Sequence, residues 1–196
     1  MDIEKIKQLR EMTGAGMMKA KEALAEAGGD LDRAIDLLRL AGASSAAKKA
    51  DREARNGLIE AYVHAGRIGV LVEVNCETDF VARTDDFKEF ARDVAMHIAA
   101  SNPEFLNPES IPAERVEKEK AFFIEELSGQ NKPAEMIDKI IAGKLAKYYE
   151  TVCLTNQPFI KDPDKTITTL TTDLISKLGE NIVIRRFERI ELGVNQ

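Results

Sequence analysis

The hydrophobic period of the chain changes at Gly57, and this change constrains the fold more than any other feature. Up to residue 42, apolar side chains recur every three to four residues, the spacing of amphipathic helices. From Leu58 to Asn75 the apolar residues instead form two β-rich runs on either side of Ala65-Gly66-Arg67, which predicts a β-hairpin. The sequence therefore predicts an α+β protein whose amino-terminal part is helical.

Residues 1–42 predict a bundle of three short helices. Asp2 and Asp30 stand where helix N-caps are expected, and glycines at 14–16 and 28–29 separate the apolar stripes. A tight turn between two helices is also the plain interpretation of Gly14-Ala15-Gly16, which lacks the third glycine of a phosphate-binding loop. A bundle of this size is near the lower limit for independent stability, so we expect its outer face to be a contact surface as well.

Residues 43–56 are rich in alanine and charge and contain almost no side chain large enough to pack, which predicts a helical linker. Its basic side chains are Lys48, Lys49, Arg52 and Arg55. The simplest interpretation is a solvated helix face, and contact with nucleic acid is the alternative. The net charge of −6 argues against broad affinity for nucleic acid, because phosphate binding requires clustered basic residues.

Residues 57–196 predict an α+β core with a small antiparallel sheet packed by helices. After the hairpin, the helical period returns with Thr84 as N-cap, and one helix face carries Phe87, Phe90, Val94, His97 and Ile98. Further helices are expected near 113–127, 133–150 and 166–178, and the alternating run 181–192 predicts a closing strand. Strands at the beginning and end with helices between them are typical of this architecture.

The sequence contains none of the common motifs of enzymes, such as a phosphate loop, HExxH, GxSxG or CxxC, so we expect no catalytic residue, metal or cofactor. Its only histidines are His64 and His97, and the position of His97 on an apolar stripe favours a hydrogen-bonded core or interface residue. Cys76 and Cys153 lie in apolar surroundings, where free thiols act as small hydrophobic groups. With no apolar leader and no run of 18 apolar residues, a cytoplasmic protein without membrane contact is expected.

Two segments are candidates for partner binding. Thr78-Asp79-Phe80-Val81 connects a strand to a helix, and loops at such junctions often carry function. In one interpretation Phe80 packs under the helix while Asp79 caps a turn; in the other, Phe80 is exposed and inserts into a partner. Met17 and Met18 point about 100° apart on a helix, so we expect one to face the bundle and the other to be exposed.

Several blocks of the sequence together resemble the bacterial translation elongation factor Ts family in its short form. The blocks are LR at 9–10, TGAGMM at 13–18, AAKKA at 46–50, NCETDFVA at 75–82, AMHIAA at 95–100, QPF at 157–159 and GENI at 179–182. They follow the family's order along nearly the whole chain. The resemblance implies a guanine nucleotide exchange factor, not an enzyme, whose amino-terminal bundle is of the ubiquitin-associated type.

The resemblance also implies a partner and a mechanism. The factor binds elongation factor Tu with GDP, displaces Mg²⁺ and promotes GDP release during translation elongation. Thr78, Asp79, Phe80 and Val81 would displace the magnesium ion, with Phe80 as a wedge between helices of the partner's G domain. His97 would contact the partner near the phosphate end of the nucleotide.

For the bundle, the resemblance implies docking on the G domain of elongation factor Tu through Arg10, Met17 and Met18. Short members of the family pair as homodimers, so a second copy is an expected partner. Two alternatives remain open at this point. The chain could be a ribosome- or RNA-associated protein that uses the basic segment 48–55, or a ubiquitin-type or peptide adaptor that uses the bundle.

Overall fold

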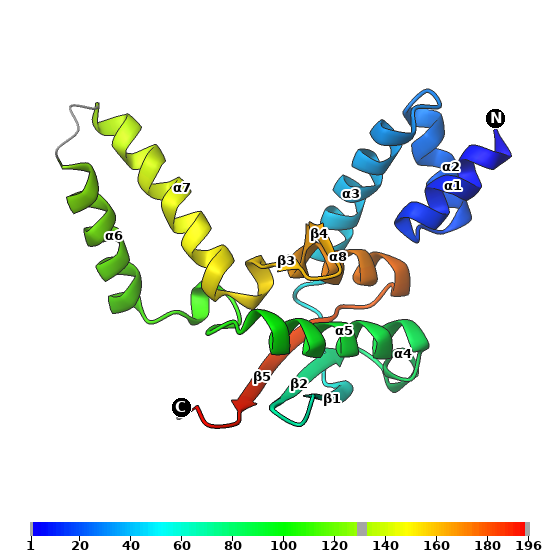
Figure 1. Ribbon diagram of the computed structural model, residues 1–196. Coiled ribbons are helices and arrows are strands. Elements are labelled where there is room, and N and C mark those ends of the chain that lie inside the picture. Colours follow the sequence, from blue (N-terminus) through cyan, green and yellow to red (C-terminus); the bar gives the residue numbers. More distant parts are fainter. Residues whose placement is uncertain (1, 129–132, 195–196) are drawn as a thin grey trace.

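The computed structural model describes residues 2–128 and 133–194. The chain folds into a helical bundle, a core of strands and helices, and a helical hairpin (Figure 1). Helices α1, α2 and α3 form the amino-terminal bundle. Helices α6 (Ala113–Leu127) and α7 (Ala134–Val152) form a hairpin on the opposite side of the molecule. Between them lies a core of strands and helices. The fold is α+β, as the sequence predicts.

The bundle contains helices α1 (Ile3–Thr13), α2 (Met17–Glu26) and α3 (Leu31–Ala47). The side chains of Asp2 and Asp30 each accept a backbone N–H at 3.1 Å, which confirms both predicted N-caps. Gly14 ends α1 in the left-handed conformation, at φ 66°, where a glycine carries no steric cost. The bundle has a hydrophobic core of its own, with buried Ile6, Leu9, Ala20, Ala23, Leu24, Ala27 and Ala34.

Helix α3 extends beyond the bundle and packs on α8 (Ile167–Leu178). Gly42 is buried on α3 and faces Thr172 and Ser176 of α8, and a Cβ atom added to it would lie in ordinary van der Waals contact with Thr172 Cγ2, at 3.8 Å. The close packing attaches the bundle to the core through its third helix.

Only the beginning of segment 43–56, which we expected to be a helical linker, is helical, because α3 ends at Ala47. Residues 48–51 form turns. The side-chain amide of Asn181 donates hydrogen bonds to the carbonyl oxygens of Ala50, at 3.3 Å, and Arg52, at 2.8 Å. These carbonyls therefore bond to the core and do not continue the helix.

A three-stranded antiparallel sheet in the order β1-β2-β5 forms the centre of the core. The predicted hairpin is confirmed as β1 (Asn56–His64) and β2 (Ile68–Cys76). Strand β5 (Val183–Glu191) pairs with β2 from Ile68↔Glu191 to Asn75↔Val183. The sequence therefore predicted all three strands of this sheet.

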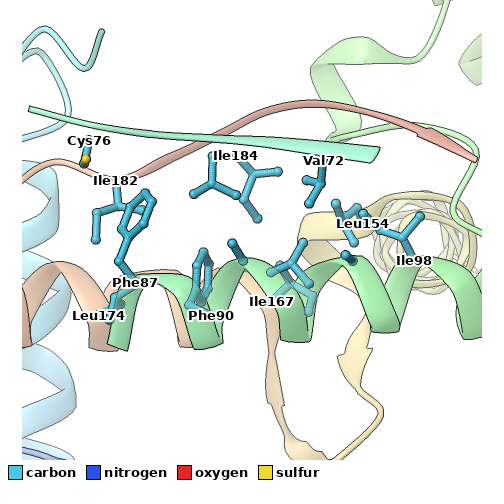
Figure 2. Close-up of a cluster of buried hydrophobic side chains, with 14 of the residues drawn as sticks. Val72, Cys76, Phe87, Phe90, Ile98, Leu154, Ile167, Leu174, Ile182 and Ile184 are labelled. Carbon is cyan, nitrogen blue, oxygen red and sulfur yellow. The ribbon is translucent and has the colours of Figure 1, made fainter. Parts of the chain in front are cut away.

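Helix α5 (Asp85–Ser101) covers one face of the sheet, and Thr84 is its N-cap, as expected. Figure 2 shows the buried side chains between this helix and the strands, including Phe87, Val72 and Ile184. The remaining elements are α4 (Asp79–Ala82), the 3-10 helices η1 (Pro108–Ser110) and η2 (Leu154–Asn156), β3 (Pro158–Phe159) and β4 (Asp162–Thr166). No helix of the described residues is long and apolar enough to span a membrane.

Candidate functional site

The segment Thr78–Val81 begins a short helix that turns Phe80 toward solvent. Thr78 is the N-cap of α4, and its hydroxyl accepts the backbone N–H of Val81 at 3.3 Å. Ala82 is buried and Val81 packs against the main core, whereas Phe80 is 78% exposed. Because the inward face of this single turn carries Val81 and Ala82, the interpretation of Phe80 as a core residue is wrong. The exposure of Phe80 that the alternative requires is confirmed, and its insertion into a partner stays a prediction.

Asp79 has a different local role from the one expected. It is the first residue of α4, and the cap that we expected from it is provided by Thr78. Its carboxylate pairs with Arg83 at 2.8 Å, one helical turn later. Both side chains are more than half exposed, so the pair contributes little to global stability and acts on the local geometry.

The backbone before Phe80 is held by Glu180, which lies between α8 and β5. Glu180 Oε2 accepts the backbone N–H groups of Glu77, at 3.1 Å, and Thr78, at 3.0 Å. Glu180 Oε1 accepts the Thr78 hydroxyl at 2.6 Å. Sequence reasoning gave Glu180 no role, because these contacts join residues more than 100 positions apart. The only available signal was its place in the GENI block.

A buried thiol adds one more contact to this loop. Cys76 Sγ donates to the carbonyl oxygen of Thr78 at 3.1 Å. Burial raises the pKa of the Cys76 thiol to about 11, so the thiol keeps the proton that it donates. Cys153 is likewise free and buried, and both cysteines fit the predicted interpretation as small hydrophobic groups.

The bundle presents a second candidate surface at the beginning of α2. Met17 is 48% exposed and Met18 is 62% exposed, so the expectation that one of them faces the bundle is wrong. The inward positions of α2 are occupied by Ala20, Ala23 and Leu24, one turn further along the helix. Arg10 is also exposed beside this turn, and its Nε donates to the carbonyl oxygen of Ala15 at 3.4 Å.

Helix α8 connects the two candidate surfaces. Lys19 of α2 donates to the carbonyl oxygen of Ser176 at 3.3 Å, and Lys177 pairs with Asp86 of α5 at 2.6 Å. Asp86 lies just after α4, the helix that carries Phe80. Figure 1 shows the bundle and α4 on the same side of the molecule.

His97 is fully buried, in agreement with its place on the apolar stripe of α5. The backbone N–H of Ile160 donates to His97 Nδ1 at 3.4 Å, so the ring proton is on Nε2, which donates to Gln157 Oε1 at 3.0 Å. Burial lowers the pKa of His97 and favours the neutral ring. In this structure the side chain is covered by its own chain, and the partner contact that the resemblance implies for His97 stays a prediction.

We expect stability to fall as the pH drops below 6.5, the ordinary pKa of histidine, because the unfolded chain then binds a proton that buried His97 does not. The slope between the unfolded and folded pKa values reaches about 1.4 kcal/mol per pH unit. The difference between the free energies of unfolding at about pH 7.5 and about pH 5.5 measures this loss of stability. His97→Gln keeps a donor and an acceptor but does not titrate. If the stability of this variant fell with pH as steeply as that of the parent chain, His97 would not be the cause of the pH dependence.

The basic segment after α3 offers no continuous face for nucleic acid. Arg52 pairs with Glu77 at 3.5 Å and Arg55 pairs with Glu53 at 2.6 Å, while Lys49 donates to the hydroxyl of Ser45. These side chains lie on turns and extended chain, not along one helix face. In the described ranges 2–128 and 133–194, His, Cys, Asp and Glu side chains form no group of three that could hold a metal ion.

Comparisons with known proteins show the family of the chain. The family model described as elongation factor TS matches residues 2–173, which is most of the chain. The elongation factor Ts of Thermodesulfovibrio yellowstonii is 52% identical over 97% of this chain and 96% of its own length. The elongation factor Ts of Syntrophus aciditrophicus is 56% identical over 96% of this chain and 94% of its own length.

A third relative has the same name. The elongation factor Ts of Carboxydothermus hydrogenoformans is 56% identical over 96% of this chain and 87% of its own length. The family match and the relatives cover both the bundle and the core, and hence both candidate surfaces. The chain belongs to the elongation factor Ts family.

Proposed function

We propose that Thr78–Val81 is the element with which this chain displaces Mg²⁺ and loosens GDP in elongation factor Tu. As a member of its family, the chain is the nucleotide exchange factor of elongation factor Tu in translation elongation. The observation that carries the proposal is the exposure of Phe80, the largest among the large apolar side chains of the described residues. An aromatic side chain held in water on a fixed turn is suited to fill a partner's pocket.

The proposed mechanism requires binding energy and no covalent chemistry. If Phe80 fits only the conformation of elongation factor Tu that has released magnesium, its insertion increases the population of that conformation. The coupling is reciprocal: the factor weakens GDP binding by the same ratio by which GDP weakens binding of the factor. In this mechanism Val81 anchors the turn in the core, Thr78 caps it, and the Asp79–Arg83 pair holds its outer side.

The bundle supplies the proposed docking contact with the G domain through Arg10, Met17 and Met18. Methionine side chains are flexible and polarizable, so they adapt to an apolar partner surface, and Arg10 adds a cation beside them. Docking at the bundle and insertion at α4 are separate tasks. Docking sets the half-saturating concentration of the factor, and insertion sets the maximal rate of GDP release.

The direct test is release of fluorescent GDP from elongation factor Tu in an excess of unlabelled GDP, with and without this chain. We expect acceleration that saturates with factor concentration. We also expect the acceleration to shrink when a chelator removes Mg²⁺ beforehand, because displacement of the ion is then already complete. No acceleration at any concentration would refute the function, and acceleration independent of the chelator would refute the magnesium step.

Replacing both Met17 and Met18 by serine is expected to raise the half-saturating factor concentration about tenfold, since two exposed apolar contacts are lost. The maximal release rate should stay close to that of the parent chain, because Phe80 is untouched. Met136→Ser is the matched control, since Met136 is 50% exposed on α7. An unchanged half-saturating concentration in the double variant would exclude this docking surface.

We further propose that a second copy of the chain covers the open face of the sheet. Ile59, Val63, Leu71 and Ile190 are each more than half exposed. The strand register places them on the face opposite α5, with Val63 and Ile190 on either side of Gly69. An exposed group of apolar side chains on one face of a sheet marks an interaction surface, and the same face of a second copy can cover it in a two-fold dimer.

A further inference from the structure

We infer that Glu180 is a positioning residue for nucleotide exchange, which fixes the backbone that presents Phe80 before the partner is met. The inference rests on the proposed function of Thr78–Val81 and adds to it a residue from the far end of the sequence. Glu180 does not touch the partner in this scheme. It acts through the loop that Phe80 belongs to.

Glu180 holds two consecutive residues, Glu77 and Thr78, by three hydrogen bonds, which together we call the clamp. One carboxylate oxygen accepts two backbone N–H groups, and the other accepts the Thr78 hydroxyl. All three donors belong to Glu77 and Thr78, immediately before α4. Hydrogen bonds to an ionised carboxylate are stronger than neutral ones, and Glu180 is partly buried, which limits competition from water.

A reciprocal contact makes the clamp two-sided. Glu77 Oε1 accepts the backbone N–H of Asn181 at 2.7 Å, so each segment donates to a glutamate of the other. Asn181 is 4% exposed and also holds the chain after α3 through Ala50 and Arg52. The loop before Phe80 therefore cannot shift without also disturbing the connection between α8 and β5.

The same hydroxyl of Thr78 performs two functions at once. It donates to Glu180 and accepts the backbone N–H of Val81, so the clamp continues into the cap of α4. A helix of four residues has little intrinsic stability. Without Glu180, the first turn becomes one of several conformations of the loop, and only the fraction that presents Phe80 correctly can insert.

The test compares Glu180→Ala and Glu180→Gln with Glu150→Gln, a change at an exposed glutamate of α7. Glu180→Ala removes all three hydrogen bonds of the carboxylate. We expect it to lower the maximal rate of GDP release by at least about tenfold, the effect of a single hydrogen bond to a charged group. The half-saturating concentration should change little, because docking by the bundle is intact. Glu180→Gln keeps one carbonyl acceptor for the backbone, so its rate should lie between those of Glu180→Ala and the parent chain.

Two further measurements separate positioning from general stability. In Glu180→Ala, hydrogen exchange should accelerate at the amides of Glu77 and Thr78 while the amides of central β2 stay protected. In the Phe80→Ala background, Glu180→Ala should cause no further loss of rate, because both changes act at one step. If Glu180→Ala unfolds at the assay temperature, Glu180→Gln and Thr78→Val decide the matter by the same measurements.

The inference is overturned if Glu180→Ala folds and releases GDP at the parent rate, or if its effect is undiminished in the Phe80→Ala background. Failure of the proposed function has a different signature. In that case Phe80→Ala itself leaves the rate unchanged, or the parent chain does not accelerate release at all. A rate that falls in Phe80→Ala but not in Glu180→Ala refutes only the role of Glu180.

Discussion

Replacing Phe80 by alanine is expected to reduce the acceleration of GDP release about a hundredfold, the size of effect typical of a central aromatic side chain in an interface. The free energy of unfolding should change by about 1 kcal/mol or less, because the side chain is already in solvent. A core phenylalanine would cost about 3 to 5 kcal/mol at the same substitution. Melting curves and release rates of the same preparation distinguish the two cases.

Phe122→Ala is the matched control for this experiment. Phe122 is also exposed, at 60%, but lies on α6, on the side of the molecule opposite to α4. Its loss should leave the release rate at the parent value. A large fall in melting temperature in Phe80→Ala, or equal release rates in the two variants, would contradict the wedge.

Leu71→Glu combined with Ile190→Glu is expected to convert a dimer to a monomer, and light scattering coupled to size exclusion measures the mass. Two carboxylates per copy would become buried without partners in the proposed interface, at a cost of several kcal/mol for each charge. In the monomer both side chains are exposed on strands that remain paired, so the fold should persist. Circular dichroism checks this point.

Leu40→Glu is the matched control for the interface, because Leu40 is 69% exposed on α3. This variant should keep the mass of the parent chain. A parent chain that is monomeric at micromolar concentration would contradict the dimer. A double variant that remains dimeric would place the interface on another face.

The elements that the sequence predicted are those with a strong local signal. Caps such as Asp30 and Thr84, and the apolar stripe of α5, depend on residues within one or two helical turns. The buried position of His97 followed from the same stripe. The end of α3 was missed because its cause lies far away in the sequence. The carbonyl oxygens of Ala50 and Arg52 accept hydrogen bonds from the side-chain amide of Asn181, and not from backbone N–H groups of a continued helix.

The candidate site was harder to predict because the direction of a side chain on a short helix has no periodic signal. α4 has four residues, too few to show which face is apolar, so the orientation of Phe80 remained open until the fold was known. The exposure of both Met17 and Met18 was missed for a related reason, because the first turn of a helix can extend beyond the core that the later turns pack against. The role of Glu180 depends on tertiary structure alone.

The pairing of β2 with β5 joins residues 68–75 to residues 183–191, and this separation has a consequence for synthesis of the chain. A chain grows from its amino terminus, so the bundle and the β1–β2 hairpin are complete long before β5 exists. Until then β2 has an unpaired edge, and the loop before Phe80 has no Glu180. The final part of the chain therefore closes the sheet and sets the loop together, and a nascent chain that has reached only Gly179 lacks both the strand partner of β2 and the carboxylate that holds the loop.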